Sequence, residues 1–111
     1  MVDAEHIREN QGAFKLVDVR TSQEFAYGHI PGAVNIPYSS SFDITSEATA
    51  RQPQAFAEAG IGKDDALVLY CHMGPRAQAA AEALAAAGFK NVEVYTGGWA
   101  DWASDPNRPV E

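Results

Sequence analysis

The sequence predicts an α/β domain with a central, mainly parallel sheet and helices on both faces. Short segments rich in valine, leucine and isoleucine alternate with helical patterns along the chain, as strands joined by crossover helices do. The segment LVLYC (67–71) is apolar on successive residues, which is typical of a central strand covered on both faces. The 111 residues suffice for one core, so we expect a single domain over residues 1–111.

Four segments carry the strand pattern. They are residues 15–19, 33–37, 66–71 and 92–95. The third is the continuously apolar one, and it is expected in the middle of the sheet.

The helices between the strands have local signals. In TSQE (21–24), Thr21 can cap a helix whose Glu24 reaches back to the backbone, and this helix is expected to end near Gly28. The serine run at 39–41 predicts a loop. Pro53 divides the following segment, which predicts two short helices near 47–51 and 53–59.

The longest helix is expected to start at about Arg76 and to continue through residues 77–87, where AQAAAEALAAA has very high helix propensity. Gly88 followed by Phe89 suits a left-handed helix end closed by an apolar contact. A short helix carries Trp99 and Trp102 on one side, where we expect both to pack in the core. The last residues form a mostly irregular tail.

Composition and charge exclude several classes of function. The net charge of −7 argues against binding to nucleic acid, and no apolar run approaches the roughly 20 residues that cross a bilayer. The first residues carry neither a basic leader nor an apolar run, so we expect a cytoplasmic protein without a membrane anchor. With one cysteine there is no internal disulfide, and any sulfur cycle must finish on an outside thiol.

That cysteine opens the stretch CHMGPR (71–76) between the central strand and the longest helix. Cys71 therefore lies at the carboxyl end of a parallel strand, where open α/β sheets hold their sites. Backbone amides at the start of the helix and the charge of Arg76 would favour a thiolate. A buried packing cysteine is the alternative. The order strand, glycine turn, arginine and helix favours a nucleophile.

Three segments closely resemble a single-domain rhodanese, a member of the rhodanese-like sulfurtransferase family. They are LVDVRTSQEFAYGHIPGAVNIP (16–37), LVLYCHMGPRA (67–77) and VYTGGWADW (94–102), in the right order across nearly the whole chain. The resemblance implies a rhodanese-like three-layer domain. It also implies that Cys71 takes a sulfane sulfur from thiosulfate or a similar donor, holds it as a persulfide, and passes it to cyanide or a thiol acceptor.

The resemblance further implies a substrate cradle in the loop. Its members are His72, Met73, Gly74, Pro75 and Arg76. The N–H groups of this loop would stabilise the persulfide, and Arg76 would attract a small anionic donor. Met73 and Pro75 could add an apolar rim for an organic or protein thiol, and the role of His72 stays open.

Asp18 and Arg20 of DVR are implied to support the loop from beneath or beside it. Arg20 would pair with Glu24 or with Asp18. An ion pair that is only structural is the alternative to a role in holding loop backbone groups.

Loop length separates sulfur chemistry from phosphate chemistry. Four residues lie between Cys71 and Arg76, one fewer than in the cysteine phosphatases, and the tighter ring suits a single sulfur atom. A cysteine phosphatase or arsenate reductase is therefore disfavoured. A catalytically weak binding or regulatory module of the same fold is the other alternative.

The three histidines show no metal-ligand spacing with the cysteine. His6, His29 and His72 do not form a zinc pattern with Cys71, so we expect neither a metal nor another cofactor. His29 in GHIPG is interpreted as a turn histidine bonded to the backbone, with a proton shuttle as the alternative.

Overall fold

A computed structural model describes residues 2–39 and 43–111 and shows one four-stranded parallel sheet. Its strands are β1 (Lys15–Asp18), β2 (Val34–Asn35), β3 (Ala66–Tyr70) and β4 (Asn91–Val94), in the order β2-β1-β3-β4. All three strand pairs are parallel, which confirms the predicted sheet with β3 in its interior. The loop predicted at 39–41 lies mostly outside the described residues.

The register aligns the carboxyl ends of the two central strands. Asp18, the last residue of β1, stands opposite Tyr70, the last residue of β3. One residue further on, the amide of Val19 donates to the carbonyl oxygen of Tyr70 at 2.9 Å. The segments that leave β1 and β3 therefore start side by side, and these segments contain Arg20 and Cys71.

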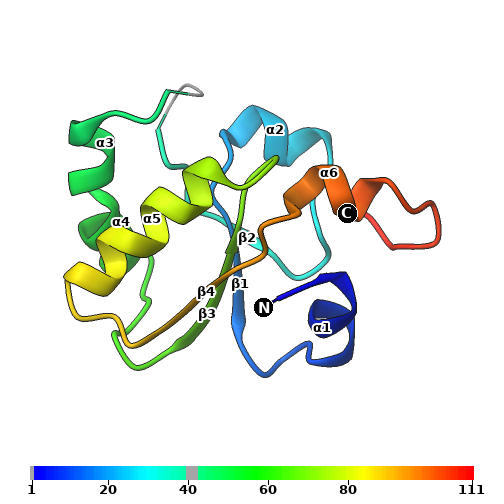
Figure 1. The fold of residues 1–111 in the computed structure, drawn as a ribbon, viewed down its shortest axis with the longest axis horizontal. Coiled ribbons are helices and arrows are strands. Elements are labelled where there is room, and N and C mark those ends of the chain that lie inside the picture. Colours follow the sequence, from blue (N-terminus) through cyan, green and yellow to red (C-terminus); the bar gives the residue numbers. More distant parts are fainter. Residues whose placement is uncertain (1, 40–42) are drawn as a thin grey trace.

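Three helices cover one face of the sheet: α3 (Ser46–Ala50), α4 (Gln52–Glu58) and α5 (Pro75–Ala86) (Figure 1). On α5 the buried side chains facing this core are small except Leu84, so the helix lies close to the strands. Phe89 is buried after Gly88, and its amide donates to the carbonyl oxygen of Leu84 at 3.0 Å. The predicted helix end is confirmed, and the helix begins one residue before the predicted start near Arg76, with Pro75 at its first position.

The other face is covered by α1 (Ala4–Glu9) and α6 (Gly98–Ala103), which makes the fold three-layered (Figure 1). Ile7, Tyr70 and Trp102 are fully buried in this second core. The helix α1 was not predicted from the sequence. Its local signal is Asp3, whose side chain accepts from the amide of His6 at 2.8 Å.

The helix α2 (Ser22–Tyr27) follows β1 at the carboxyl edge of the sheet, near the start of α5 (Figure 1). The predicted capping box is present, because Thr21 accepts from the amide of Glu24 and Glu24 accepts from the amide of Thr21. The helix ends at Gly28 as predicted. None of its residues is buried. The carboxylate of Glu24 on this helix contacts Arg76, in the loop that follows β3.

Candidate active site

The predicted loop begins directly at the end of β3. Cys71 is 1% exposed, and its Sγ atom accepts a hydrogen bond from the amide of Gly74 at 3.0 Å. Gly74 has φ +116, and a Cβ atom there would approach the carbonyl oxygen of Thr96 to 3.2 Å. The turn therefore requires glycine, and it leads the chain straight into α5.

The sulfur atom lies at the amino end of a twelve-residue helix. Amides of the first helical turn have no partners inside the helix, and the helix dipole places a partial positive charge there. Both effects favour a negative charge on the sulfur or on an atom bound to it.

The helix α6 holds the outer side of the loop. Its first-turn amides donate to loop carbonyl oxygens: Trp99 to Cys71 at 2.9 Å and Ala100 to His72 at 3.0 Å. In a trans peptide the C=O and N–H groups point in opposite directions, so the amides of His72 and Met73 face away from α6. The N–H groups of His72 and Met73 are therefore not used by α6.

Gly98 makes this close approach possible. Its φ is +62, and a Cβ atom there would lie 2.5 Å from the carbonyl oxygen of Cys71 and 2.6 Å from that of His72. No side chain fits between the two backbones. The second glycine of the TGGW segment is therefore a packing requirement of the loop.

The side chains of His72, Met73 and Pro75 are exposed, and that of Met73 is 69% exposed. Arg76 is buried instead, and its guanidinium forms a two-point ion pair with Glu24 of α2. The distances are 2.8 Å from Nη1 to Oε1 and 3.2 Å from Nη2 to Oε2. The structure thus brings a carboxylate to the loop arginine.

The pKa of the Glu24 carboxyl group is strongly lowered. Burial alone would raise the pKa of Glu24, but the hydrogen bonds from Arg76 and Thr21 and the charge of Arg76 outweigh it and lower the pKa to about 2. Glu24 is therefore ionised throughout the neutral range and remains paired with Arg76.

Asp18 and Arg20 form a second, deeper ion pair. They are 0% and 2% exposed, and Arg20 Nη2 donates to Asp18 Oδ2 at 2.7 Å and to the carbonyl oxygen of Gly28 at 2.7 Å. Burial opposes the charge of Arg20, yet the hydrogen bond and charge of Asp18 raise its pKa. Of the two partners left open by the sequence, the structure selects Asp18.

The same guanidinium lies over the ring of Trp99, 4.8 Å from its centroid. Arg20 thus connects the end of β1 to the helix that braces the loop. Trp102 is fully buried in the second core and the half-buried Trp99 packs against the same core, so the core packing predicted for both is confirmed. Trp99 has the contact with Arg20 in addition.

The remaining histidine candidate, His29, contacts its own turn. The Nδ1 atom of His29 is 3.0 Å from the carbonyl oxygen of Phe25, and the two rings stack. Within residues 2–39 and 43–111, no group of three or more His, Cys, Asp or Glu side chains is placed to hold a metal ion. Across the same ranges, no helix is long and apolar enough to cross a membrane.

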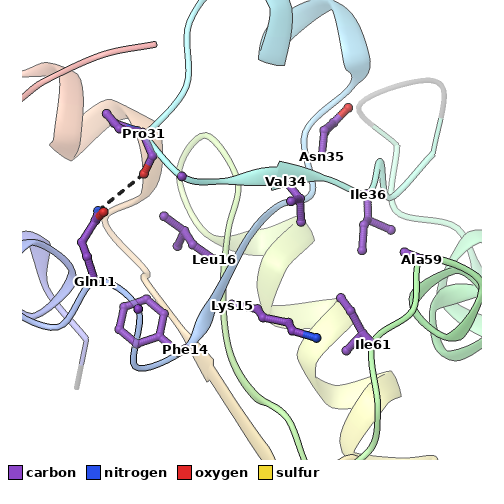
Figure 2. Close-up of a pocket in the computed structure, with 12 residues that line it drawn as sticks. Gln11, Phe14, Lys15, Leu16, Pro31, Val34, Asn35, Ile36, Ala59 and Ile61 are labelled. Atoms are coloured by element: carbon purple, nitrogen blue, oxygen red, sulfur yellow. Dashed lines mark hydrogen bonds between the residues drawn. The ribbon is translucent and has the colours of Figure 1, made fainter.

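A cavity of about 470 Å³ lies elsewhere, beside the start of β1 and the edge strand β2 (Figure 2). Its lining is mostly apolar and includes Phe14, Leu16, Val34 and Ile61. None of residues 71–76 lines it. The loop site and this cavity are therefore separate features.

The contacts of Glu24 and Gly98 with the loop were not predicted from the sequence. Glu24 was predicted to cap α2 and to be a possible partner of Arg20, whereas its ion-pair partner is Arg76, 52 positions away. The contact of Gly98 with the loop backbone is also long-range. The only sequence signal for it is the glycine pair that precedes Trp99.

Comparisons with known proteins identify the family of this chain. A sequence model of the family described as Rhodanese-like domain matches residues 3–105. Thiosulfate:glutathione sulfurtransferase of Saccharomyces cerevisiae is 38% identical over 93 residues, which cover 80% of this chain and 64% of the yeast protein. The protein of the same name from Homo sapiens is 36% identical over 92 residues, which cover 82% of this chain and 80% of the human protein.

Solved structures of similar proteins have the same fold. The human single-domain sulfurtransferase TSTD1 is similar at a TM-score of 0.76 and 27% identity, with 96% of this chain and 97% of that chain covered. The chain spans only 38% to 43% of the length of several other relatives that it matches. The family match over nearly all residues and the agreement in fold lead to one conclusion: this chain belongs to the rhodanese-like domain family.

Proposed function

We propose that this chain is a sulfurtransferase that carries a sulfane sulfur from thiosulfate or a similar donor to a thiol acceptor, or to cyanide, as a persulfide on Cys71. The observation that carries the proposal is the amide of Gly74 directed at Cys71 Sγ, 3.0 Å away, at the start of α5. Relatives named thiosulfate:glutathione sulfurtransferase support the choice of donor and acceptor. We also propose that residues 1–111 form one domain.

In the first half-reaction, the Cys71 thiolate attacks the outer sulfur of thiosulfate. A new S–S bond forms, the S–S bond of thiosulfate breaks, and sulfite leaves with the bonding electron pair. The product is a persulfide anion on Cys71, and the total charge is unchanged. The outer sulfur of this persulfide carries the charge, so the loop amides and the amino end of α5 stabilise the intermediate.

In the second half-reaction, a thiolate acceptor attacks the outer sulfur, and Cys71 leaves as a thiolate. The acceptor becomes the persulfide, so one cysteine in this chain is enough for turnover. Glutathione, named for the two relatives, is an acceptor of this kind. The cytoplasm, where such thiols are kept reduced, is the location we propose.

The roles of the other residues follow from their positions. The backbone of His72, Met73, Gly74 and Pro75 forms the cradle. The exposed side chains of His72, Met73 and Pro75 leave it open to an acceptor. Arg76 fixes the loop to α2 through Glu24. Asp18 and Arg20 support α6 from below and do not contact the sulfur through their side-chain hydrogen bonds.

The proposal is tested by incubating the protein with thiosulfate and measuring its intact mass. We expect the wild type to gain the mass of one sulfur atom, and glutathione or cyanide to remove it. Cys71→Ser should form no adduct. An unchanged wild-type mass together with no turnover of thiosulfate would overturn the proposal, and hydrolysis of an aryl phosphate that Cys71→Ser abolishes would favour a phosphatase.

A further inference from the structure

The ion pair between Arg76 and Glu24 changes the electrostatics expected at the loop. A free arginine guanidinium can bind two oxygen atoms of an anionic donor such as thiosulfate at once. Here the guanidinium is occupied by both oxygen atoms of Glu24. The side chains of Arg76 and Glu24 are only 8% and 19% exposed, so water screens the pair poorly.

The pair therefore contributes little net charge to the loop. The positive potential at the sulfur then comes mainly from backbone amides and the dipole of α5, equivalent to about half an elementary charge. Because Glu24 has a pKa of about 2, this balance holds at every pH near neutrality.

We propose that Glu24 is a specificity-determining residue that acts through Arg76: by neutralising the arginine, it lets singly charged organic sulfur donors compete with doubly charged thiosulfate. The attraction of a donor scales with the product of its charge and the potential at the site. A weaker potential thus penalises the dianion most. This inference rests on the proposed function, and it assigns a substrate class to that site.

The chain offers a clean variant for testing it. Glu24→Gln keeps an oxygen atom that can accept from the Thr21 amide, a bond of 2.9 Å in the wild type, and a capping box accepts glutamine as well as glutamate. The variant therefore removes the charge and retains the helix cap. The charge of Arg76 is then no longer balanced by Glu24.

A matched control lies on α1, at the opposite end of the sheet from the loop (Figure 1). Glu5 is 3.7 Å from Arg8 in an exposed ion pair. Glu5→Gln removes the same charge from the chain and also breaks a glutamate–arginine pair. It therefore controls for the loss of one negative charge from the chain at an exposed position away from the loop.

The experiment measures kcat/KM for thiosulfate and for 3-mercaptopyruvate, a singly charged organic donor, at low and high ionic strength. For Glu24→Gln we expect kcat/KM to rise about five-fold with thiosulfate and about two-fold with 3-mercaptopyruvate at low salt. The difference should vanish near 1 M salt, where the Debye length is about 3 Å. Glu5→Gln should leave the ratio between the donors unchanged.

Other outcomes separate this inference from the proposed function. An equal change with both donors, insensitive to salt, would show that Glu24 only supports the structure and would overturn the inference. If the wild type uses neither donor, the proposed function fails, and alkylation of Cys71 still tests the electrostatics. Iodoacetate and iodoacetamide have nearly the same size but differ by one negative charge. Glu24→Gln should therefore raise the rate of alkylation by iodoacetate relative to that by iodoacetamide. An unchanged ratio of the two rates would overturn the inference.

Discussion

The backbone amide of Trp99 donates to the carbonyl oxygen of Cys71 at 2.9 Å, so the helix α6 rather than the loop itself fixes the peptide that follows the candidate nucleophile. The ring of Trp99 lies under the guanidinium of Arg20, which the carboxylate of Asp18 holds in place. The loop is thus braced by α6, and α6 is in turn braced by the end of β1. The contact between the loop and α6 and the ion pair at the end of β1 can therefore be tested separately.

Replacing Gly98 by alanine should displace the loop. Its φ of +62 is unfavourable for alanine, and the new Cβ atom would lie 2.5 Å from the carbonyl oxygen of Cys71. We expect kcat/KM for thiosulfate to fall by about ten-fold or more, because shifts near 1 Å at a reacting group have effects of this size. Steady-state kinetics and urea unfolding of Gly98→Ala measure both consequences.

Gly60→Ala is the matched control for backbone strain. Gly60 has φ +86, and a Cβ atom there would meet nothing within 4 Å. This variant should lose about 1 kcal/mol of stability and keep its activity. If the two alanine variants lose activity to the same extent, contact between Gly98 and the loop is not what positions Cys71.

The buried pair of Asp18 and Arg20 should matter mainly for stability. Arg20→Met would leave the carboxylate of Asp18, which is 0% exposed, without its counter-charge. We expect a loss of about 3–5 kcal/mol in the free energy of unfolding. Adding Asp18→Asn should recover part of that loss, because the two residues interact directly.

Urea unfolding of the two single variants and the double variant completes this cycle. Additive losses would show that the ion pair contributes no coupling. The folded double variant should still form the persulfide, since neither side chain hydrogen-bonds the sulfur.

Local physics explains which parts of the fold could be predicted. The strands, the capping box at Thr21 and the helix end at Gly88 depend on neighbouring residues, and all of them are found. The helix α1 was missed although Asp3 caps it, because a six-residue helix has little stability of its own and α1 lacks the complete capping box that indicates α2. It is held by packing, with Ile7 fully buried in the second core, and no local pattern shows that contact.

The same division holds for the candidate site. Cys71 at a strand end and Gly74 in the turn could be placed from a continuous stretch of sequence. The partners of the loop could not, because Glu24 and Gly98 reach it only through the tertiary arrangement of α2 and α6. Apart from the glycine pair that precedes Trp99, the sequence carries no local signal for these long-range contacts.

The exposed side chain of Met73 predicts a role with the acceptor. It is 69% exposed on the cradle, where an apolar group can contact an organic thiol. Met73→Ser should raise the KM for an apolar thiol acceptor about three-fold or more, with a smaller effect on the thiosulfate half-reaction. Val34→Thr is the control, because Val34 is 51% exposed on the edge strand β2 and should have no effect on either. Equal effects on donor and acceptor would contradict a role as an acceptor rim.

The ion pair at the loop also predicts how stability depends on pH. The pKa of Glu24 is lowered in the folded protein from its ordinary value of 4.5 to about 2. A lowered pKa stabilises the folded state above the unfolded value, so this contribution is complete above about pH 5 and disappears as the pH falls through 2. Because Glu24 is partly exposed, we expect a contribution of about 1–2 kcal/mol.

Urea unfolding of the wild type and of Glu24→Gln between pH 7 and pH 2 isolates this contribution, since the other carboxyl groups are common to both proteins. Glu24→Gln should be less stable by about 1–2 kcal/mol at pH 7, and the difference should shrink between pH 4.5 and pH 2 as Glu24 becomes protonated. A difference that stays constant over this range would mean that the charge of Glu24 does not stabilise the fold. The loop would then be held to α2 by packing and by neutral hydrogen bonds, which a glutamine can also make.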